Sequence, residues 1–153
     1  MKYMLTLLVV TVTVVGAIDN KTAPVDPVIL PCVSHTMNLG DVVLVQSPGY
    51  PARLTNKSSC QQNIVCQSPP AMFEVNCEVF NLEDLSTCAN ERLLISYNTT
   101  SSTFCGNITS TWVFPTNEMN LEFITNGQHN SPGYKCSITC LREQTNDQPQ
   151  QVM

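Results

Sequence analysis

The chain has 153 residues, of which 42% are hydrophobic and 12% charged, and its formal net charge at pH 7 is −5. This length suits one domain with a modest core and is too short for two ordinary domains. The Lys and Arg residues form no basic run, which excludes nucleic acid as an expected partner because phosphate contacts need clustered cationic side chains.

Residues 1–17 have the pattern of a cleaved signal peptide. Lys2 supplies a positive start, the stretch 4–15 is almost wholly apolar, and Val15 and Ala17 occupy positions −3 and −1 of the expected cleavage site. An apolar stretch of about a dozen residues is too short to cross a bilayer, which needs roughly 20. An uncleaved anchor is the alternative interpretation. No second hydrophobic stretch follows, so we expect an exported protein without a membrane span.

All eight cysteines follow the leader, and four N-x-S/T sequons accompany it, at Asn20, Asn56, Asn98 and Asn107. In an exported protein an even number of cysteines predicts a disulfide framework, although spacing alone permits roughly a hundred connectivities. The sequons predict N-glycosylation, which requires exposed loops or strand ends at the modified residues.

Three regions follow the leader. Residues 18–31 contain Pro24, Pro27 and Pro31 and predict an extended N-terminal segment. Residues 32–141 hold all the cysteines and nearly all of the strand-like patterning. Residues 142–153 are polar and rich in Gln, which predicts a disordered tail.

The region 32–141 has the period-two alternation of β-strands. The segments with this pattern, or with a short apolar run, are 42–45, 73–79, 93–97, 121–123 and 134–140. No stretch keeps a 3.6-residue period. Many short strands separated by turns predict an antiparallel sandwich or barrel.

Three cysteines, Cys77, Cys136 and Cys140, fall on the apolar tracks of these predicted strands, so their sulfur atoms should face the interior. Two packed sheets about 10 Å apart bring inward side chains together, which is the approach that a buried disulfide requires. The pairing itself does not follow from this pattern.

Several short motifs occur in the order and spacing of a CUB domain. In chain order they are Gly40-Asp-Val-Val-Leu44, Ser47-Pro-Gly-Tyr-Pro51, Cys60, Phe80-Asn-Leu-Glu83, Cys88, Leu93-Leu-Ile95, Cys105-Gly106, Leu121-Glu-Phe123 and Gly133-Tyr134. The region 32–141 therefore resembles a CUB domain. The resemblance implies an all-β, jelly-roll-like sandwich of two mainly antiparallel sheets. It also implies disulfides Cys32–Cys60 and Cys88–Cys105.

The other four cysteines depart from the general CUB pattern. Cys77, where many CUB domains have an apolar residue, resembles the version in arthropod secreted proteins, including CUB segments that precede trypsin-like proteases. In those proteins it pairs with the last strand, which here implies Cys77–Cys136 and leaves Cys66–Cys140. The crossed alternative, Cys66–Cys136 with Cys77–Cys140, stays open.

Some CUB domains bind calcium at one end of the sandwich and use it to order loops that recognise a basic side chain of a partner. Glu83 and Glu91 match acidic positions of that site, Asn126 stands where the family has Asp, and Leu54 stands where a Tyr is expected. Replacing a carboxylate with an amide weakens a calcium site. We therefore expect no bound cofactor, and we keep Glu83, Glu91 and Asn126 as candidate calcium ligands.

The sequence offers little for catalysis. The only histidines, His35 and His129, sit in no nucleophile, zinc-hydrolase or phosphate-loop motif and are expected to be loop residues. A metal pair at Cys136 and Cys140 is less expected than disulfides in an exported protein. The single tryptophan, Trp112, is expected to be a packing residue. We expect no enzymatic activity.

Two functions remain from the sequence. The first is a free-standing recognition module that binds an extracellular protein or glycan through its surface loops. The second is an accessory or remnant of a secreted trypsin-like protease system. The leader at the start, and the end of the chain soon after residue 141, favour the first.

The narrower expectation comes from family analogy. A lone exported CUB domain with arthropod-like extra cysteines resembles CUB proteins of insect venoms, especially those of predatory bugs. Seminal-fluid adhesins also use lone CUB domains, usually with fewer cysteines. The sequence thus predicts a secreted, non-catalytic venom component. Its target and oligomeric state do not follow.

Overall fold

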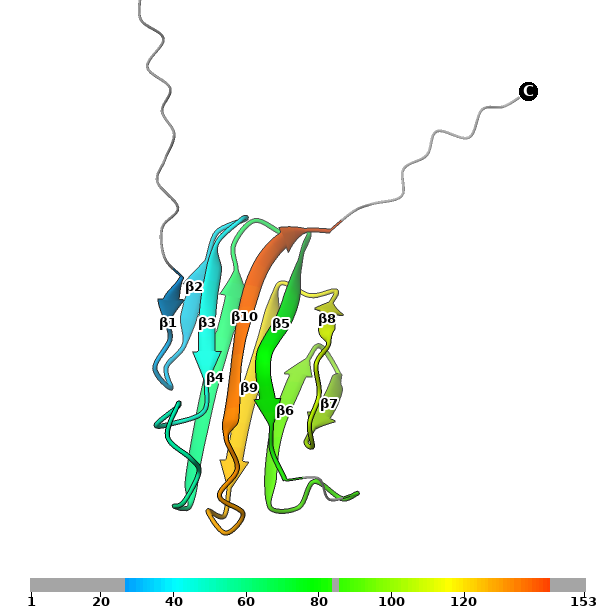
Figure 1. Cartoon of the computed structure of the whole chain (residues 1–153). Coiled ribbons are helices and arrows are strands. Elements are labelled where there is room, and N and C mark those ends of the chain that lie inside the picture. Colours follow the sequence, from blue (N-terminus) through cyan, green and yellow to red (C-terminus); the bar gives the residue numbers. More distant parts are fainter. Residues whose placement is uncertain (1–26, 84–85, 144–153) are drawn as a thin grey trace, which may run out of the picture.

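The computed structural model describes residues 27–83 and 86–143, which form ten β-strands in two facing five-stranded sheets (Figure 1). The first sheet has the order β1 (Val28–Ile29), β3 (Val42–Gln46), β10 (Gly133–Arg142), β5 (Ala71–Asn81) and β8 (Thr111–Phe114). The second has the order β2 (His35–Met37), β4 (Ser58–Cys66), β9 (Glu118–Thr125), β6 (Glu91–Tyr97) and β7 (Thr100–Phe104).

The pairing of strands is mainly antiparallel. Only the short strands at one side, β1 with β3 and β2 with β4, pair in parallel among the described residues. The last strand, β10, lies between β3 and β5, and β9 lies between β4 and β6. The prediction of an all-β sandwich with two mainly antiparallel sheets is confirmed.

The core lies between the two sheets because side chains of alternate residues in each strand face inward. In β5, Phe73, Val75 and Cys77 are buried, whereas Asn76 and Glu78 are exposed. From β10, the buried Tyr134 ring reaches Phe123 of the opposite sheet, with 5.3 Å between ring centroids. Burying a large apolar side chain contributes about 1.5–3 kcal/mol, so these rows account for much of the stability.

Two disulfides involve the strands of the first sheet. Cys66 at the end of β4 is joined to Cys140 of β10 and so connects the two sheets. Cys77 is joined to Cys136 within the first sheet, because the two residues lie opposite each other on β5 and β10 with 3.9 Å between their Cα atoms. The inward orientation expected for Cys77 and Cys136 is present, but their bridge crosses one sheet rather than the space between two.

The other two disulfides secure segments outside the sheets. Cys32, between β1 and β2, is joined to Cys60 of β4. Cys88, between β5 and β6, is joined to Cys105, which follows β7. The crossed alternative for Cys66 and Cys77 is not what the structure contains.

The predicted domain limits can be placed on this fold. β1 lies inside the segment 18–31 that was expected to be extended, and β10 ends at Arg142, the first residue of the expected tail. The expected signal peptide 1–17, the sequon at Asn20 and the tail residues 144–153 lie outside the described residues. Within the described part of the chain there is no helix that could cross a bilayer.

The sandwich has two ends of different character. At the lower end in Figure 1, which we call the loop end, lie the β3–β4 connection (47–57), the described parts of the β5–β6 connection (82–83 and 86–90) and the β9–β10 connection (126–132). At the opposite end, which we call the turn end, lie the β6–β7 turn (98–99) and the β8–β9 connection (115–117).

Candidate functional site

A buried carboxylate lies at the base of the loop end. Glu91, the first residue of β6, is fully buried and faces the interior. Its Oε1 accepts a hydrogen bond from the Thr125 hydroxyl at 3.0 Å, and its Oε2 accepts one from the backbone N–H of Glu83 at 3.0 Å. These bonds offset the cost of removing a charge from water, which is large for an unpaired carboxylate. Glu91 thus ties β6 to β9 and to the β5–β6 connection.

A second carboxylate joins two loops. Glu83 Oε1 lies 2.7 Å from His129 Nε2, and the side chains are 10% and 36% exposed. The same nitrogen lies 3.3 Å from the Asn90 amide nitrogen. Among the described residues, Glu83 Oε2 has no hydrogen-bond partner. With its proton on Nε2 the imidazole donates a hydrogen bond to the carboxylate, so the pair joins the β5–β6 and β9–β10 connections.

The third predicted calcium ligand has its side chain hydrogen-bonded within its own loop. The Asn126 side chain closes its own loop, because its Oδ1 accepts from the Gln128 backbone N–H at 3.0 Å. Its Nδ2 donates to the Gln128 side-chain oxygen at 3.4 Å. Leu54, at the position expected for Tyr, is buried and offers no side-chain oxygen.

These residues do not fit a calcium ion. Calcium takes roughly six to eight oxygen ligands. Both oxygens of Glu91 accept protein hydrogen bonds, and one oxygen of Glu83 contacts His129. In the parts of the chain that the structure describes, no group of three or more His, Cys, Asp or Glu side chains could hold a metal. We therefore derive no step of the function from calcium.

The third connection of the loop end is joined to the same surface. The exposed Arg53 donates a hydrogen bond from Nη1 to the carbonyl oxygen of Asn130 at 2.8 Å. Gly127 lies against the backbone of Asn56, where a Cβ atom would come within 2.6 Å of the Asn56 Cα. The sequence predicts none of these loop contacts, because each partner lies in a different connection and no local pattern links them.

The described sequons are all exposed. Asn56 lies in the β3–β4 connection, Asn98 in the β6–β7 turn, and Asn107 after β7. Glycosylation of these residues stays a prediction.

The tryptophan and the two histidines are placed in contacts that do not form a catalytic site. Trp112 packs against Phe104 and Phe80, with ring centroids 4.5 Å and 5.9 Å apart, in the role expected for it. His35 lies on β2, where it pairs with Ile64 of β4, rather than in the loop expected from the sequence. A short parallel pairing at the sheet edge places it in a strand. His129 contacts Glu83 and Asn90, and neither is a nucleophile that a general base activates.

Solved structures with the same fold include parts of multidomain proteins. The CUB1-EGF-CUB2 domains of rat MASP-1 align with a TM-score of 0.61 and 20% identity, over 71% of this chain and 42% of that one. The extracellular region of zebrafish Gpr126/Adgrg6 aligns with a TM-score of 0.63 and 20% identity, over 73% and 15%. This chain therefore spans less than half of either protein.

One similar structure is a single domain, and the alignment covers nearly all of it. The MASP-1 CUB2 domain bound to Ca²⁺ aligns with a TM-score of 0.58 and 18% identity, over 67% of this chain and 96% of that one. No curated protein sequence matches the chain significantly. The family profile described as "CUB domain" matches residues 36–138, which is more than half of the chain. The chain belongs to the CUB domain family.

Proposed function

We propose that this protein is a secreted, non-catalytic binding protein that recognises an extracellular protein or glycan through its loop end, and that it is a venom component. CUB domains are binding modules, are mostly extracellular and are not catalytic. The four disulfides agree with an oxidising compartment.

The observation that carries the proposal is the convergence of three connections at the loop end. Glu83 with His129, and Arg53 with the Asn130 carbonyl, hold these connections together at 2.7 Å and 2.8 Å. Binding loops that are already ordered lose less conformational entropy when a partner binds. Exposed side chains such as Gln128 lie on this surface and are available for recognition.

A matched pair of Gln→Arg substitutions tests the location of the binding surface. The secreted, glycosylated protein is immobilised and used to capture proteins and glycans from extracellular fluid of target tissue. We expect Gln128→Arg, at the loop end, to lower the retention of the main partner at least about tenfold, since a misplaced charge in an interface costs over 1 kcal/mol. Gln67→Arg, between β4 and β5, should retain the partner. Equal retention by both variants contradicts a loop-end surface.

The venom assignment has a separate test. Targeted mass spectrometry of venom, haemolymph and seminal fluid from the source animal measures where the protein accumulates. We expect enrichment in venom. Enrichment in seminal fluid instead contradicts the proposal and supports an adhesin-like role.

A second candidate function is that of an accessory to a secreted trypsin-like protease. The disulfide between Cys77 and Cys136 favours it, because this extra pair resembles that of arthropod CUB segments that precede such proteases. If the captured partner is a protease, and Gln128→Arg no longer captures it, the accessory function is supported. A captured protein or glycan of the target tissue supports the first function instead.

A further inference from the structure

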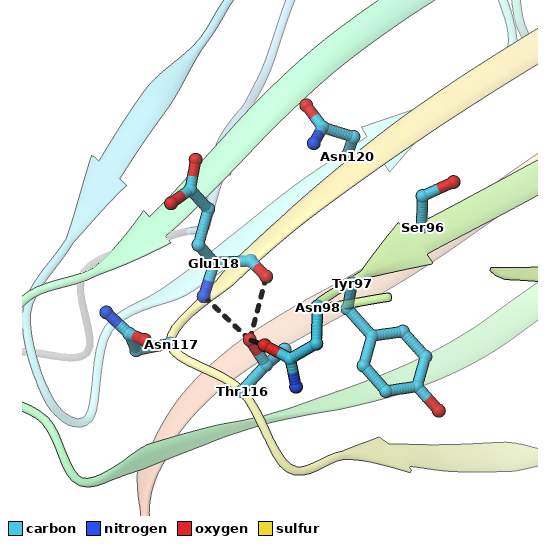
Figure 2. Close-up of a pocket in the computed structure, with 7 residues that line it drawn as sticks. All are labelled: Ser96, Tyr97, Asn98, Thr116, Asn117, Glu118 and Asn120. Atoms are coloured by element: carbon cyan, nitrogen blue, oxygen red, sulfur yellow. Dashed lines mark hydrogen bonds between the residues drawn. The ribbon is translucent and has the colours of Figure 1, made fainter. Parts of the chain in front are cut away.

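The turn end carries a polar pocket at the opposite end of the sandwich from the candidate recognition surface. Its volume is about 270 Å³ (Figure 2). Ser96, Tyr97 and Asn98 line it from the end of β6 and the β6–β7 turn, and the other wall comes from residues 116–118 and Asn120.

The chemistry of the lining selects a class of ligand. Apart from Tyr97 and the carboxylate of Glu118, the pocket presents neutral amide and hydroxyl side chains and no cation. Such a lining does not suit a phosphate or sulfate, which needs cationic groups, or a lipid, which needs an apolar wall. Neutral groups that both donate and accept hydrogen bonds match the hydroxyl and N-acetyl groups of a sugar.

Part of the pocket is rigidly built. The buried Thr116 hydroxyl accepts from the Glu118 backbone N–H at 3.2 Å. The same hydroxyl lies 2.9 Å from the Glu118 carbonyl oxygen and 3.4 Å from Asn98 Oδ1, so its one proton can be donated to either (Figure 2). Tyr97 packs edge-to-face against Phe114, with 5.2 Å between ring centroids.

Other groups of the pocket are free to bind. Ser96 and Asn120 lie opposite each other on β6 and β9. In the described structure no side-chain hydrogen bond is formed by Ser96, Asn117 or Asn120, although all three line the pocket. Hydrogen-bonding groups held at a concave surface without protein partners are those that a polar ligand can use.

One residue of the lining is itself a predicted glycosylation site. Asn98 begins the sequon Asn98-Thr-Thr100, is exposed, and adopts a positive φ of 50° in the turn. Its Oδ1 points toward Thr116, while Nδ2, the atom to which a glycan is linked, is directed elsewhere (Figure 2). Because Asn98 is itself a lining residue, a glycan on it starts at the rim of the pocket.

We propose that the first sugars of the N-glycan on Asn98, the N-acetylglucosamine core, dock in this pocket against Thr116, Asn117 and Asn120. The tether makes the binding intramolecular, at an effective concentration on the order of millimolar or above. Contacts that bind a free sugar only weakly are then enough to hold the attached one. The docked glycan covers part of the turn end.

The test compares release of two glycans from the native protein by an amidase that cleaves the Asn–sugar bond. Asn107, another exposed sequon, is the reference. We expect the Asn98 glycan to be released about fivefold more slowly, because the docked fraction is inaccessible to the enzyme. After denaturation both sites should be released at the same rate. Mass spectrometry of the peptides follows each site.

A pocket variant separates docking from local crowding. Asn117→Ala with Asn120→Ala leaves the sequon intact and should raise the Asn98 release rate to that of Asn107. Protection that survives this change overturns the proposal, as do equal native release rates at Asn98 and Asn107 in the unchanged protein. Absence of a glycan on Asn98 in the secreted protein also overturns it.

A free disaccharide distinguishes the protein's own glycan from a sugar on a partner. Saturation-transfer NMR with N,N′-diacetylchitobiose should detect binding to Thr100→Ala, which removes the sequon and keeps Asn98 in the pocket, and at least about fivefold less to the fully glycosylated protein. Equal binding to both shows that the attached glycan leaves the pocket empty, which overturns the proposal. Asn107→Gln is the control that removes a glycan elsewhere.

Discussion

Gly127 shows how one residue without a side chain lets two connections of the loop end meet. Its φ of +73° lies in the left-handed region, and a Cβ atom there would come within 2.7 Å of the Asn56 backbone nitrogen. Gly40 has a similar φ of +87°, but a Cβ atom there would meet nothing within 4 Å. Substituting the two glycines by alanine therefore separates the free-energy cost of the left-handed backbone from the cost of a steric clash with Asn56.

We predict that Gly127→Ala destabilises the protein more than Gly40→Ala does. The Gly40 variant has only the conformational cost, about 1–2 kcal/mol for a non-glycine residue in the left-handed region. The Gly127 variant must also displace the β3–β4 connection. Urea unfolding of both variants measures the difference, and equal losses of unfolding free energy would contradict the close contact with Asn56.

The buried carboxylate of Glu91 permits a second test of the loop end. We expect Glu91→Gln to lower the free energy of unfolding by about 1–3 kcal/mol. Its amide NH₂ must face either the Glu83 N–H, which can only donate, or the Thr125 hydroxyl, which would then accept and lose the acceptor for its own proton. Glu122→Gln on β9, where Glu122 is only half-buried, should stay within about 0.5 kcal/mol of the unchanged protein. An unchanged free energy of unfolding in Glu91→Gln would contradict the hydrogen bonds described.

Tyr134 gives the protein a dependence on alkaline pH. Burial raises the pKa of its phenol, because the interior disfavours the charged phenolate. The buried, neutral Tyr134 therefore makes its full contribution to the free energy of unfolding below the unfolded-state pKa of about 10. That contribution is lost progressively as the pH rises above this value, because the unfolded chain can then release the phenol proton. We expect the melting temperature of the unchanged protein to fall more steeply than that of Tyr134→Phe between about pH 9 and about pH 11. Parallel curves would contradict this.

The sequence pattern predicted the strands that have an apolar face on the core. It did not predict strands at a sheet edge or strands with a polar residue on the inward face. The alternation over 73–79, 93–97 and 134–140 falls within β5, β6 and β10. β7 lies at the edge of the second sheet with mostly exposed side chains, so it lacks an apolar track. In β4 the inward position 62 holds Gln62, whose amide donates to the Pro31 carbonyl at 2.6 Å.

The pairing of the cysteines between strands can be tested by opening one bridge. In Cys66→Ala, the former partner becomes a free thiol, which iodoacetamide labels in denaturant without reductant. We expect tandem mass spectrometry to find the label on Cys140, whereas the crossed alternative places it on Cys136. The bridge closes a loop of 74 residues, for which the chain-entropy model gives about 4 kcal/mol of stabilisation. The labelling result does not depend on how much stability the variant loses.

At the scale of the whole molecule, contacts of the Glu83, Arg53 and Glu91 side chains join the connections of the loop end. We predict that the melting temperature is the same in millimolar calcium as in EDTA, because a ligand stabilises only a fold that binds it. Magnesium at equal concentration controls for ionic strength. A clear rise with calcium alone would show that Glu83 and Glu91 serve as ligands despite their bonds to His129 and Thr125.

The sequence by itself determined the class of the molecule. Composition, an even number of cysteines and the period-two alternation are local properties, and they sufficed to predict an antiparallel sandwich or barrel with Cys77, Cys136 and Cys140 facing inward. The resemblance to CUB domains then favoured the sandwich. The tertiary structure alone decided which partners meet. Glu83 with His129, and the pocket between β6 and the β8–β9 connection, depend on the order of strands in each sheet. Alternation says which face of a strand is buried but not which strand lies beside it, because that order arises from contacts between residues far apart in the chain.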